Sequence, residues 1–119
     1  MIHKLTIDHK FINLNETINY SRRNKYLANK IKKEEMEVVR LSTTGMKKIK
    51  NYPVEIKFIW HIKNINSDLD NKLAKSILDG LVLANKLEND SLKYISKITH
   101  EYIKDKKDYV VIEINEGND

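Results

Sequence analysis

The chain has 119 residues, of which 22 are Lys or Arg and 17 are Asp or Glu, so its formal net charge is +5. A chain of this length typically folds as one domain and buries enough apolar surface to be stable without disulfides or a structural metal. Cysteine is absent, which excludes disulfide scaffolds and thiolate metal sites. Apolar residues make up 40% and charged residues 33% of the chain, which is typical of a globular protein. We expect a single domain over residues 1–119.

Neither a targeting signal nor a membrane span is expected. Residues 1–6 read Met-Ile-His-Lys-Leu-Thr and do not begin an apolar run of signal-peptide length. No stretch approaches the roughly 18 consecutive apolar residues that a membrane-spanning helix needs. The sequence therefore predicts a cytoplasmic protein.

The charge is unevenly distributed along the chain. Residues 1–60 hold 13 basic and 6 acidic residues, whereas residues 61–119 hold 9 basic and 11 acidic residues. Lys outnumbers Arg 19 to 3, a bias typical of AT-rich coding sequences, so many lysines are expected to be ordinary surface residues. The segment 22–50 still has ten basic and three acidic residues, which favours a polyanionic partner.

In chain order, the first predicted element is a short strand that begins at Leu5-Thr6-Ile7. Helical periodicity follows, because four apolar residues fall on one face of a helix. These residues are Leu27, Ile31, Val38 and Leu41. We place this helix at about residues 18–43, with Gly45 as a stop signal just past its end.

The clearest strand follows Pro53, where residues alternate between apolar and mostly polar. The residues expected to face the core are Val54, Ile56, Phe58, Trp60 and Ile62. A polar turn at 64–67 leads to a second predicted helix at about residues 70–85. The buried stripe of that helix is expected to be Leu73, Ile77, Leu81 and Ala84, with Ala74 and Leu78 beside it.

Two further strands are predicted at about residues 92–100 and 108–115, and we expect them to form an antiparallel hairpin. The element order is then β-α-β-α-β-β. One mixed sheet packed with two main helices is the economical way to bury these apolar faces. The predicted fold class is α+β.

Two carboxylates, Asp68 and Asp70, stand between the strand after Pro53 and the second helix. In an extended backbone, residues i and i+2 point to the same side, about 6.6 Å apart, so the two charges repel. A divalent cation removes this conflict, and Mg²⁺ takes oxygen ligands while keeping several waters. Asp90 is a candidate third ligand. Because a helix of about 16 residues is about 24 Å long, Asp90 reaches the pair only if the chain doubles back after Leu87.

A simpler interpretation of these charged residues stays open. Asp70 or Ser67 would be the N-cap of the helix, and Asp68 a neighbour that the helix dipole favours. Lys75 and Asp79 are an i,i+4 pair, which as a solvated ion pair contributes only a few tenths of a kcal/mol.

The sequence gives little support to a histidine metal site, a phosphate-binding loop or a serine nucleophile. The four histidines have no metal-binding spacing, and neither a Gly-rich phosphate loop nor a nucleophilic serine elbow is present. His61 is expected on the second face of its strand. Phe58 and Trp60 lie at strand spacing and are expected to belong to the core rather than to stack on bases.

A series of short motifs connects the charged residues. It consists of Asp68-Leu69-Asp70-Asn71, Ala74-Lys75, Ile77-Leu78-Asp79-Gly80-Leu81 and Asn89-Asp90. This series resembles the Asp-x-Asp-Asn, Lys, Leu-Asp-(Ala/Gly)-Leu and (Asp/Asn)-Asp motifs of the RusA-type Holliday junction resolvases, especially their small phage-borne relatives. Leu5-Thr6-Ile7, Leu14-Asn15-Glu16 and the basic segment from Arg22 to Lys33 are similar to the opening strand, turn and basic helix of that family. The resemblance covers nearly the whole chain.

The resemblance implies a Mg²⁺-dependent endonuclease, with Mn²⁺ as a substitute, that acts as a homodimer on four-way DNA junctions in recombination and repair. It also implies a bacterial or phage-infected cell as the setting. The three metal-binding aspartates of the family correspond to Asp68, Asp70 and Asp90, and its catalytic lysine to Lys75. The compact family pattern places this lysine where the chain has Ala74, so Lys72 is a second candidate. Asp79 matches a frequent aspartate of the family, and we expect its role to be structural.

The candidate DNA contacts are Arg22, Arg23, Lys25, Lys30, Lys32, Lys33 and Lys72. An alternative function keeps these contacts but not the chemistry: a non-catalytic basic module that holds DNA or RNA, with Asp68 and Asp70 as helix caps. A nuclease that prefers flaps or other branches would use the same residues as a resolvase.

Overall fold

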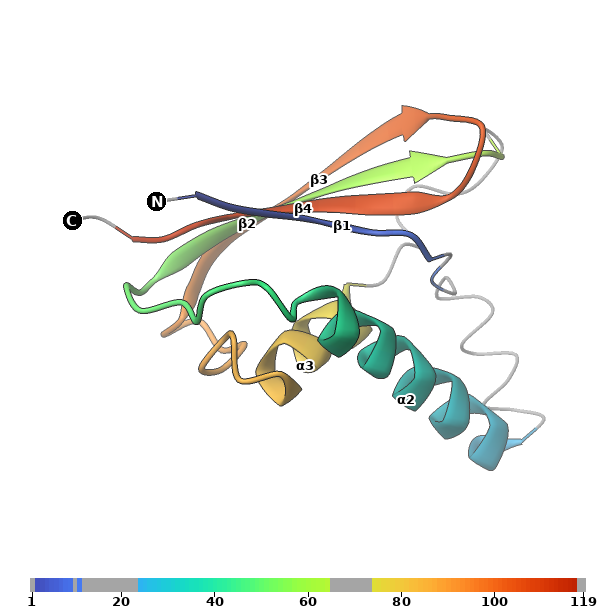
Figure 1. Cartoon of the computed structure of the whole chain (residues 1–119), viewed down its shortest axis with the longest axis horizontal. Helices are drawn as coiled ribbons and strands as arrows, with labels where there is room; N and C mark the ends of the chain where they lie inside the picture. The colour runs from blue at the N-terminus through green and yellow to red at the C-terminus, as the bar shows by residue number, and fades with distance from the viewer. Residues whose placement is uncertain (1, 10, 12–23, 65–73, 118–119) are drawn as a thin grey trace.

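The computed structural model describes residues 2–9, 11, 24–64 and 74–117. In this part of the chain, a four-stranded mixed sheet carries two helices on one of its faces (Figure 1). The predicted α+β fold and its element order are confirmed. In chain order the elements are β1 (Ile2–Ile7), α2 (Lys25–Ser42), β2 (Val54–Ile62), α3 (Lys75–Leu83), β3 (Ile95–Lys104) and β4 (Tyr109–Asn115). Neither described helix is long and apolar enough to cross a bilayer.

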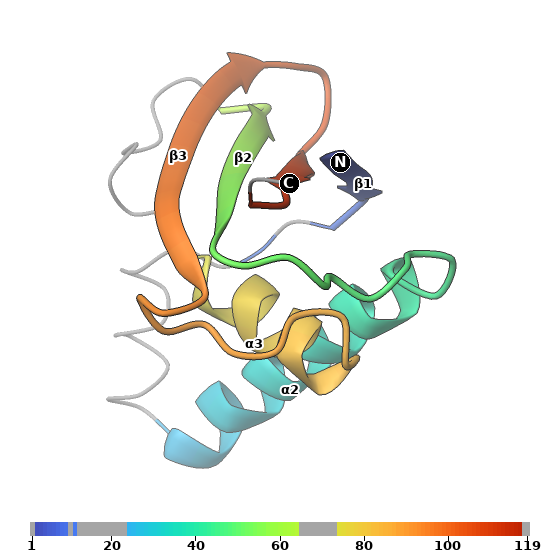
Figure 2. The same ribbon diagram turned by 90° about the vertical axis from the view of Figure 1, so that its left-hand side faces the viewer.

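The sheet order is β1-β4-β2-β3, so the expected hairpin between the last two strands is wrong. β2 lies between them, antiparallel to β4 and parallel to β3, and α3 is the crossover that parallel pairing requires. Figure 2 shows β1 and β3 at opposite sides of the sheet. The physical reason lies in the side chains. β3 is exposed along most of its length, which suits an edge strand, whereas β2 alternates strictly and fills a central position.

The core follows the alternation of β2 and β4. The five residues of β2 predicted to face the core are between 0 and 6% exposed, so this prediction is confirmed. Val110, Ile112 and Ile114 of β4 are fully buried and pair with Trp60, Phe58 and Ile56 of β2. Of the stripe predicted for α3, Ile77 and Leu81 are fully buried, Ala84 is partly buried, and Leu73 lies outside the described residues.

α2 begins later than the sequence predicts. Asn24 has an extended backbone (φ −165°), and its side chain accepts the backbone N–H groups of Tyr26 and Leu27. Asn24 is therefore an N-cap that starts α2 at Lys25, and the predicted start at about residue 18 is wrong. The end of α2 at Ser42 lies within one residue of the prediction. α3 spans Lys75–Leu83, with Ala74 at the N-cap position, and the predicted start at about residue 70 lies outside the described residues.

The buried face of α2 also differs from the prediction. Leu27 and Leu41 of the expected stripe are 37% and 60% exposed, while Glu35 and Val39 are buried. The reason is that α2 packs against α3, where Gly80 lets the two backbones approach closely. A Cβ added at Gly80 would lie 2.6 Å from the Cβ of Val39, far inside normal contact.

Candidate functional site: a lysine and carboxylate network at the start of α3

Asp90 returns to the beginning of α3 because the chain reverses sharply after that helix. The N–H of Lys86 bonds to the carbonyl of Leu81 (3.0 Å), and the N–H of Asn85 bonds to that of Val82 (3.0 Å). Asn85 has a φ of 61°, so the helix ends in a Schellman motif with Asn at its left-handed position. The condition that the sequence set for Asp90, a chain that doubles back, is met.

The returning segment is held against the loop that precedes β2. The N–H of Ile49 donates to the carbonyl of Lys86 (2.9 Å). The N–H of Glu88 donates to the Tyr52 hydroxyl (2.9 Å). Leu87 between these two bonds is 1% exposed. Backbone bonds and one buried side chain thus place Asp90 without help from its own carboxylate.

Lys75, in the first turn of α3, joins two carboxylates. Its Nζ lies 3.0 Å from Oδ2 of Asp90 and 3.2 Å from Oδ1 of Asp79. Asp79 in turn lies 3.0 Å from Nζ of Lys32 on α2. The predicted i,i+4 pair between Lys75 and Asp79 is therefore confirmed as one link of a longer network, Lys32–Asp79–Lys75–Asp90.

The network favours the charged forms of Lys75 and Asp79. The hydrogen bonds to Asp90 and Asp79 raise the pKa of Lys75 above its usual value. Partial burial opposes ionisation of Asp79, but the bonds from Lys32 and Lys75 outweigh it and lower the pKa of Asp79. Lys75 is therefore an ammonium at neutral pH in this arrangement. It can hold a phosphate or stabilise negative charge, and it is not set up as a general base.

A buried carboxylate adjoins this network. Glu35 of α2 is only 4% exposed, and its Oε1 accepts a hydrogen bond from Oγ of Ser76 (2.8 Å). Ser76 follows Lys75 directly in the first turn of α3. Sequence reasoning missed Glu35 because it assigned the buried face of α2 to apolar residues. The available signal was the i,i+4 spacing of Glu35 and Val39, which places both on one side of the helix.

The other predicted site residues divide into two groups. Asp68, Asp70, Lys72, Arg22 and Arg23 lie outside the described residues. Lys25, Lys30 and Lys33 are exposed on α2, and in the described ranges of the chain none of them is ion-paired. Lys32 differs because its ammonium is held by Asp79, so it faces α3 as well as solvent.

The described residues contain no group of three or more His, Asp or Glu that could hold a metal ion. Of the three predicted ligands, only Asp90 is among them. Its carboxylate is 27% exposed and already shares a cation, the Lys75 ammonium, with Asp79. Carboxylate oxygens are ligands that Mg²⁺ prefers, so the chemistry of Asp90 fits the predicted ion, whose site stays a prediction.

A second polar cluster lies toward the far end of β2, on the face of the sheet away from the helices. Nδ1 of His61 is 3.0 Å from Oδ2 of Asp105, which also accepts the Tyr109 hydroxyl (3.0 Å). The rings of His61 and Tyr109 stack at 4.0 Å. The bond from the Lys106 N–H, followed by those from Tyr109 and His61, lowers the pKa of Asp105. These contacts hold Asp105, in the turn between β3 and β4, against His61 of β2 and Tyr109 of β4. The cluster therefore has a structural role.

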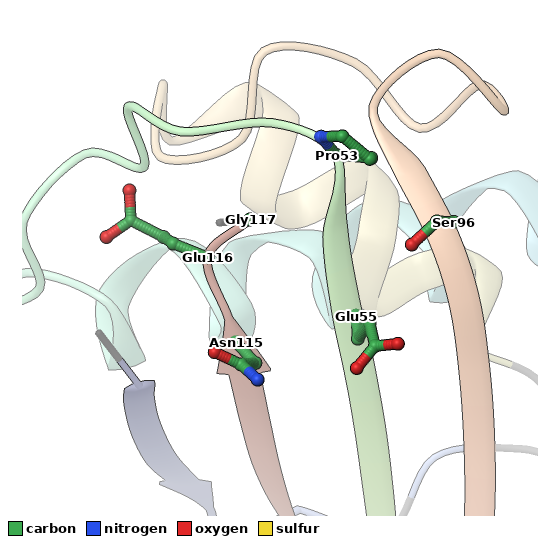
Figure 3. Close-up of a pocket in the computed structure, with 6 residues that line it drawn as sticks. All are labelled: Pro53, Glu55, Ser96, Asn115, Glu116 and Gly117. Carbon is green, nitrogen blue, oxygen red and sulfur yellow. The ribbon is translucent and has the colours of Figure 1, made fainter. Parts of the chain in front are cut away.

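A pocket of about 180 Å³ lies where β4 ends beside β2 and β3 (Figure 3). Glu116 on its wall points away from Glu55 in this view. Its carboxylate accepts the N–H groups of Lys50 (2.8 Å) and Asn51 (2.9 Å) and contacts His3 (2.7 Å). These bonds lower the pKa of Glu116 to about 2. The carboxylate is fully used in joining β1, β4 and the loop before β2, so this pocket is no catalytic candidate.

No protein-family model matches the chain, and no curated protein matches it. The candidate site is therefore defined by its own geometry. An acidic side chain from the segment after α3 meets a charged lysine in the first turn of that helix, beside a helix with exposed lysines.

Proposed function

We propose that the chain is a Mg²⁺-dependent, structure-specific endonuclease that resolves four-way DNA junctions by paired phosphodiester hydrolysis. The observation that carries the proposal is the 3.0 Å contact between Lys75 and Asp90. These residues are 15 positions apart, and the resemblance to the RusA-type resolvases requires them in one site. The cap-only interpretation concerns Asp68 and Asp70 and assigns no role to the contact of Lys75 with Asp90.

Each residue has a distinct role in this proposal. Asp68, Asp70 and Asp90 would hold the metal, which when bound would activate water and stabilise charge at the phosphate. Lys75 is charged and would hold a non-bridging oxygen of the scissile phosphate, where negative charge grows during hydrolysis. Asp79 shares Lys75 with Asp90 and orients its ammonium. Lys72 remains the second candidate for the role of Lys75.

The basic surface supplies the affinity for DNA. Lys25, Lys30 and Lys33 project from α2 without carboxylate partners among the described residues, so phosphates can become their counter-ions. Arg22 and Arg23 precede this helix in the sequence. We further propose a homodimer, because a two-fold dimer would present two sites to a two-fold symmetric junction and give paired nicks.

The experiment is cleavage of a synthetic four-way junction with labelled strands in Mg²⁺ or Mn²⁺. Wild type is expected to give symmetric nicks that chelation prevents, and Asp90→Asn is expected to give none. Glu88→Gln is the matched control, because Glu88 lies two residues away and pairs with Lys48. Wild-type cleavage that persists in Asp90→Asn would remove Asp90 from the site. If wild type cuts no branched DNA at all, the enzyme proposal fails.

A non-catalytic nucleic-acid-binding module is the second candidate. Lys25, Lys30 and Lys33 of α2, which are exposed and have no carboxylate partner in the described part of the chain, favour it, since they need no metal to bind phosphate. It predicts salt-dependent binding and no product with either cation. A nuclease for flaps would instead cut a flap faster than a four-way junction in the same assay.

A further inference from the structure

Three residues on one face of α2 contact α3. Lys32, Glu35 and Val39 follow one another at spacings of three and four, which places them on one side of the helix. They meet, in the same order, Asp79 (3.0 Å), Ser76 (2.8 Å) and the backbone at Gly80. The helix that carries the exposed lysines is thus also the element against which α3 is set.

The first turn of α3 has few local means of holding its position. Ala74 at the N-cap makes no side-chain capping bond, and the first turn contains no acidic residue. As far as the described residues show, this turn lacks the usual N-terminal stabilisation of a helix. Among the described residues, Ser76 of this turn donates a hydrogen bond to the buried Glu35 of α2. Ser76 lies immediately beside Lys75.

Burial of the Glu35 carboxylate between two helices carries a desolvation cost that an apolar side chain would not carry. A buried carboxylate must be desolvated, and a well-packed apolar side chain of similar volume is often at least as stabilising. What the carboxylate adds is direction, because it accepts a hydrogen bond at a defined point of α3. Lys32 adds a second directed contact one turn further on, through Asp79, which itself holds Lys75.

We propose that Glu35 and Lys32 are positioning residues that fix Lys75 against Asp90. A catalytic effect of this positioning depends on the proposed function. The positioning of Lys75 by Glu35 and Lys32 does not depend on it. Lys32 then acts through Asp79, in addition to any contact it makes with DNA. The proposal distinguishes Lys32 from its neighbour Lys33, which is equally basic and has no carboxylate partner in the described part of the chain.

The first test reads Lys75 directly and needs no cleavage. Limited acetylation of the folded protein, mapped by mass spectrometry of its peptides, gives a rate for each lysine. In Glu35→Ala the rate at Lys75 is expected to rise severalfold, while the rate at Lys30 stays unchanged. Glu35→Gln retains a hydrogen-bond acceptor for Ser76 and is expected to restore the wild-type rate.

Glu34→Ala is the matched control, because Glu34 is the exposed neighbour of Glu35 on the same helix. If Glu35→Ala does not fold, Ser76→Ala removes the same bond with a smaller change and takes its place. Equal Lys75 rates in wild type and in the folded variant would overturn the proposal. A rise of the same size in Glu34→Ala would also overturn it.

The second test uses junction cleavage and separates positioning from DNA binding. Glu35→Ala is expected to lower kcat by on the order of tenfold to a hundredfold with little change in KM, and Glu35→Gln to recover most of it. Lys32→Gln should lower kcat, whereas Lys33→Gln should raise KM alone. Identical effects of Lys32→Gln and Lys33→Gln would contradict the role of Lys32. If wild type has no activity, the proposed function fails and the acetylation test still decides the positioning.

Discussion

Substitution of Gly80 by Ala tests the close contact between α2 and α3 that the candidate site depends on. The new Cβ would lie 2.6 Å from Cβ and 2.8 Å from Cγ1 of Val39, and 3.1 Å from the carbonyl oxygen of Met36. Carbon atoms at rest are about 3.5–4.0 Å apart, so the overlap is about 1 Å. A Cβ cannot rotate away, so the helices themselves must separate.

The magnitude follows from two opposed effects. Overpacking of a tight contact costs about 1–3 kcal/mol, and separation of the helices also lengthens the buried bond between Ser76 and Glu35. Ala in place of Gly within a helix returns about 1 kcal/mol. These two numbers leave about 0–2 kcal/mol, and weakening of the bond between Ser76 and Glu35 raises the lower limit. We therefore expect a net loss of about 1–2 kcal/mol in the free energy of unfolding, equal to roughly 3–8 °C in Tm for a domain of this size.

The assay is urea and thermal unfolding followed by circular dichroism. Gly45→Ala is the control, because a Cβ at Gly45 meets nothing within 4 Å, and its stability should stay close to that of wild type. In the double variant Gly80→Ala with Val39→Ala, part of the clash is removed. The double variant should therefore lose less stability than the two single variants lose together. A Gly80→Ala protein as stable as wild type would refute the close packing of the helices.

Further predictions concern the buried carboxylate of Glu116, the two candidate lysines and the salt dependence of binding. Glu116→Gln is expected to lower stability at pH 7 by about 2 kcal/mol, the usual value of hydrogen bonds to a charged group, as measured by urea unfolding. The folded-state pKa of Glu116 is depressed to about 2 from 4.5, so its contribution is present above pH 4.5 and is lost as the pH falls toward 2. Wild type should therefore lose more stability than Glu116→Gln over that range, and parallel curves would contradict the assignment. Lys75→Gln should lower junction cleavage by about a hundredfold or more and Lys72→Gln much less, and the reverse order in the same kinetic assay would transfer the role to Lys72. Lys30→Gln should reduce the slope of log K against log salt by about 1, measured by fluorescence anisotropy, and an unchanged slope would remove Lys30 from the DNA surface.

Part of the candidate site could be predicted from sequence alone. The i,i+4 pair of Lys75 and Asp79 follows from helical spacing. The return of Asp90 could be stated only as a condition. Whether the chain doubles back depends on Ile49 and Tyr52, which hold the segment after α3 and are distant in sequence.

The roles of Lys32 and Glu35 could not be predicted in this way. A lysine on an amphipathic helix is expected to face solvent, and a glutamate is expected to be exposed. Glu35 is buried instead, and Lys32, although exposed, pairs with a carboxylate of α3. Their partners Ser76 and Asp79 lie more than 40 residues further along the chain. Helical periodicity alone predicted Leu27, Ile31, Val38 and Leu41 as the buried face of α2. Leu27 and Leu41 are exposed, whereas Ile31 and Val38 are partly buried.

The sequence by itself determined the elements and the inward face of the central strands. Period-two alternation is a local property, so β2 and β4 could be oriented without knowledge of their neighbours. The tertiary structure decided the strand order, the face that α2 turns toward α3, and the meeting of Lys75 with Asp90. Each of these depends on which surfaces far apart in the chain complement one another. In the folded chain, the exposed lysines of the basic first half lie on α2, next to the candidate site. In that site, two carboxylates of the second half, Asp79 and Asp90, form ion pairs with lysines from both halves.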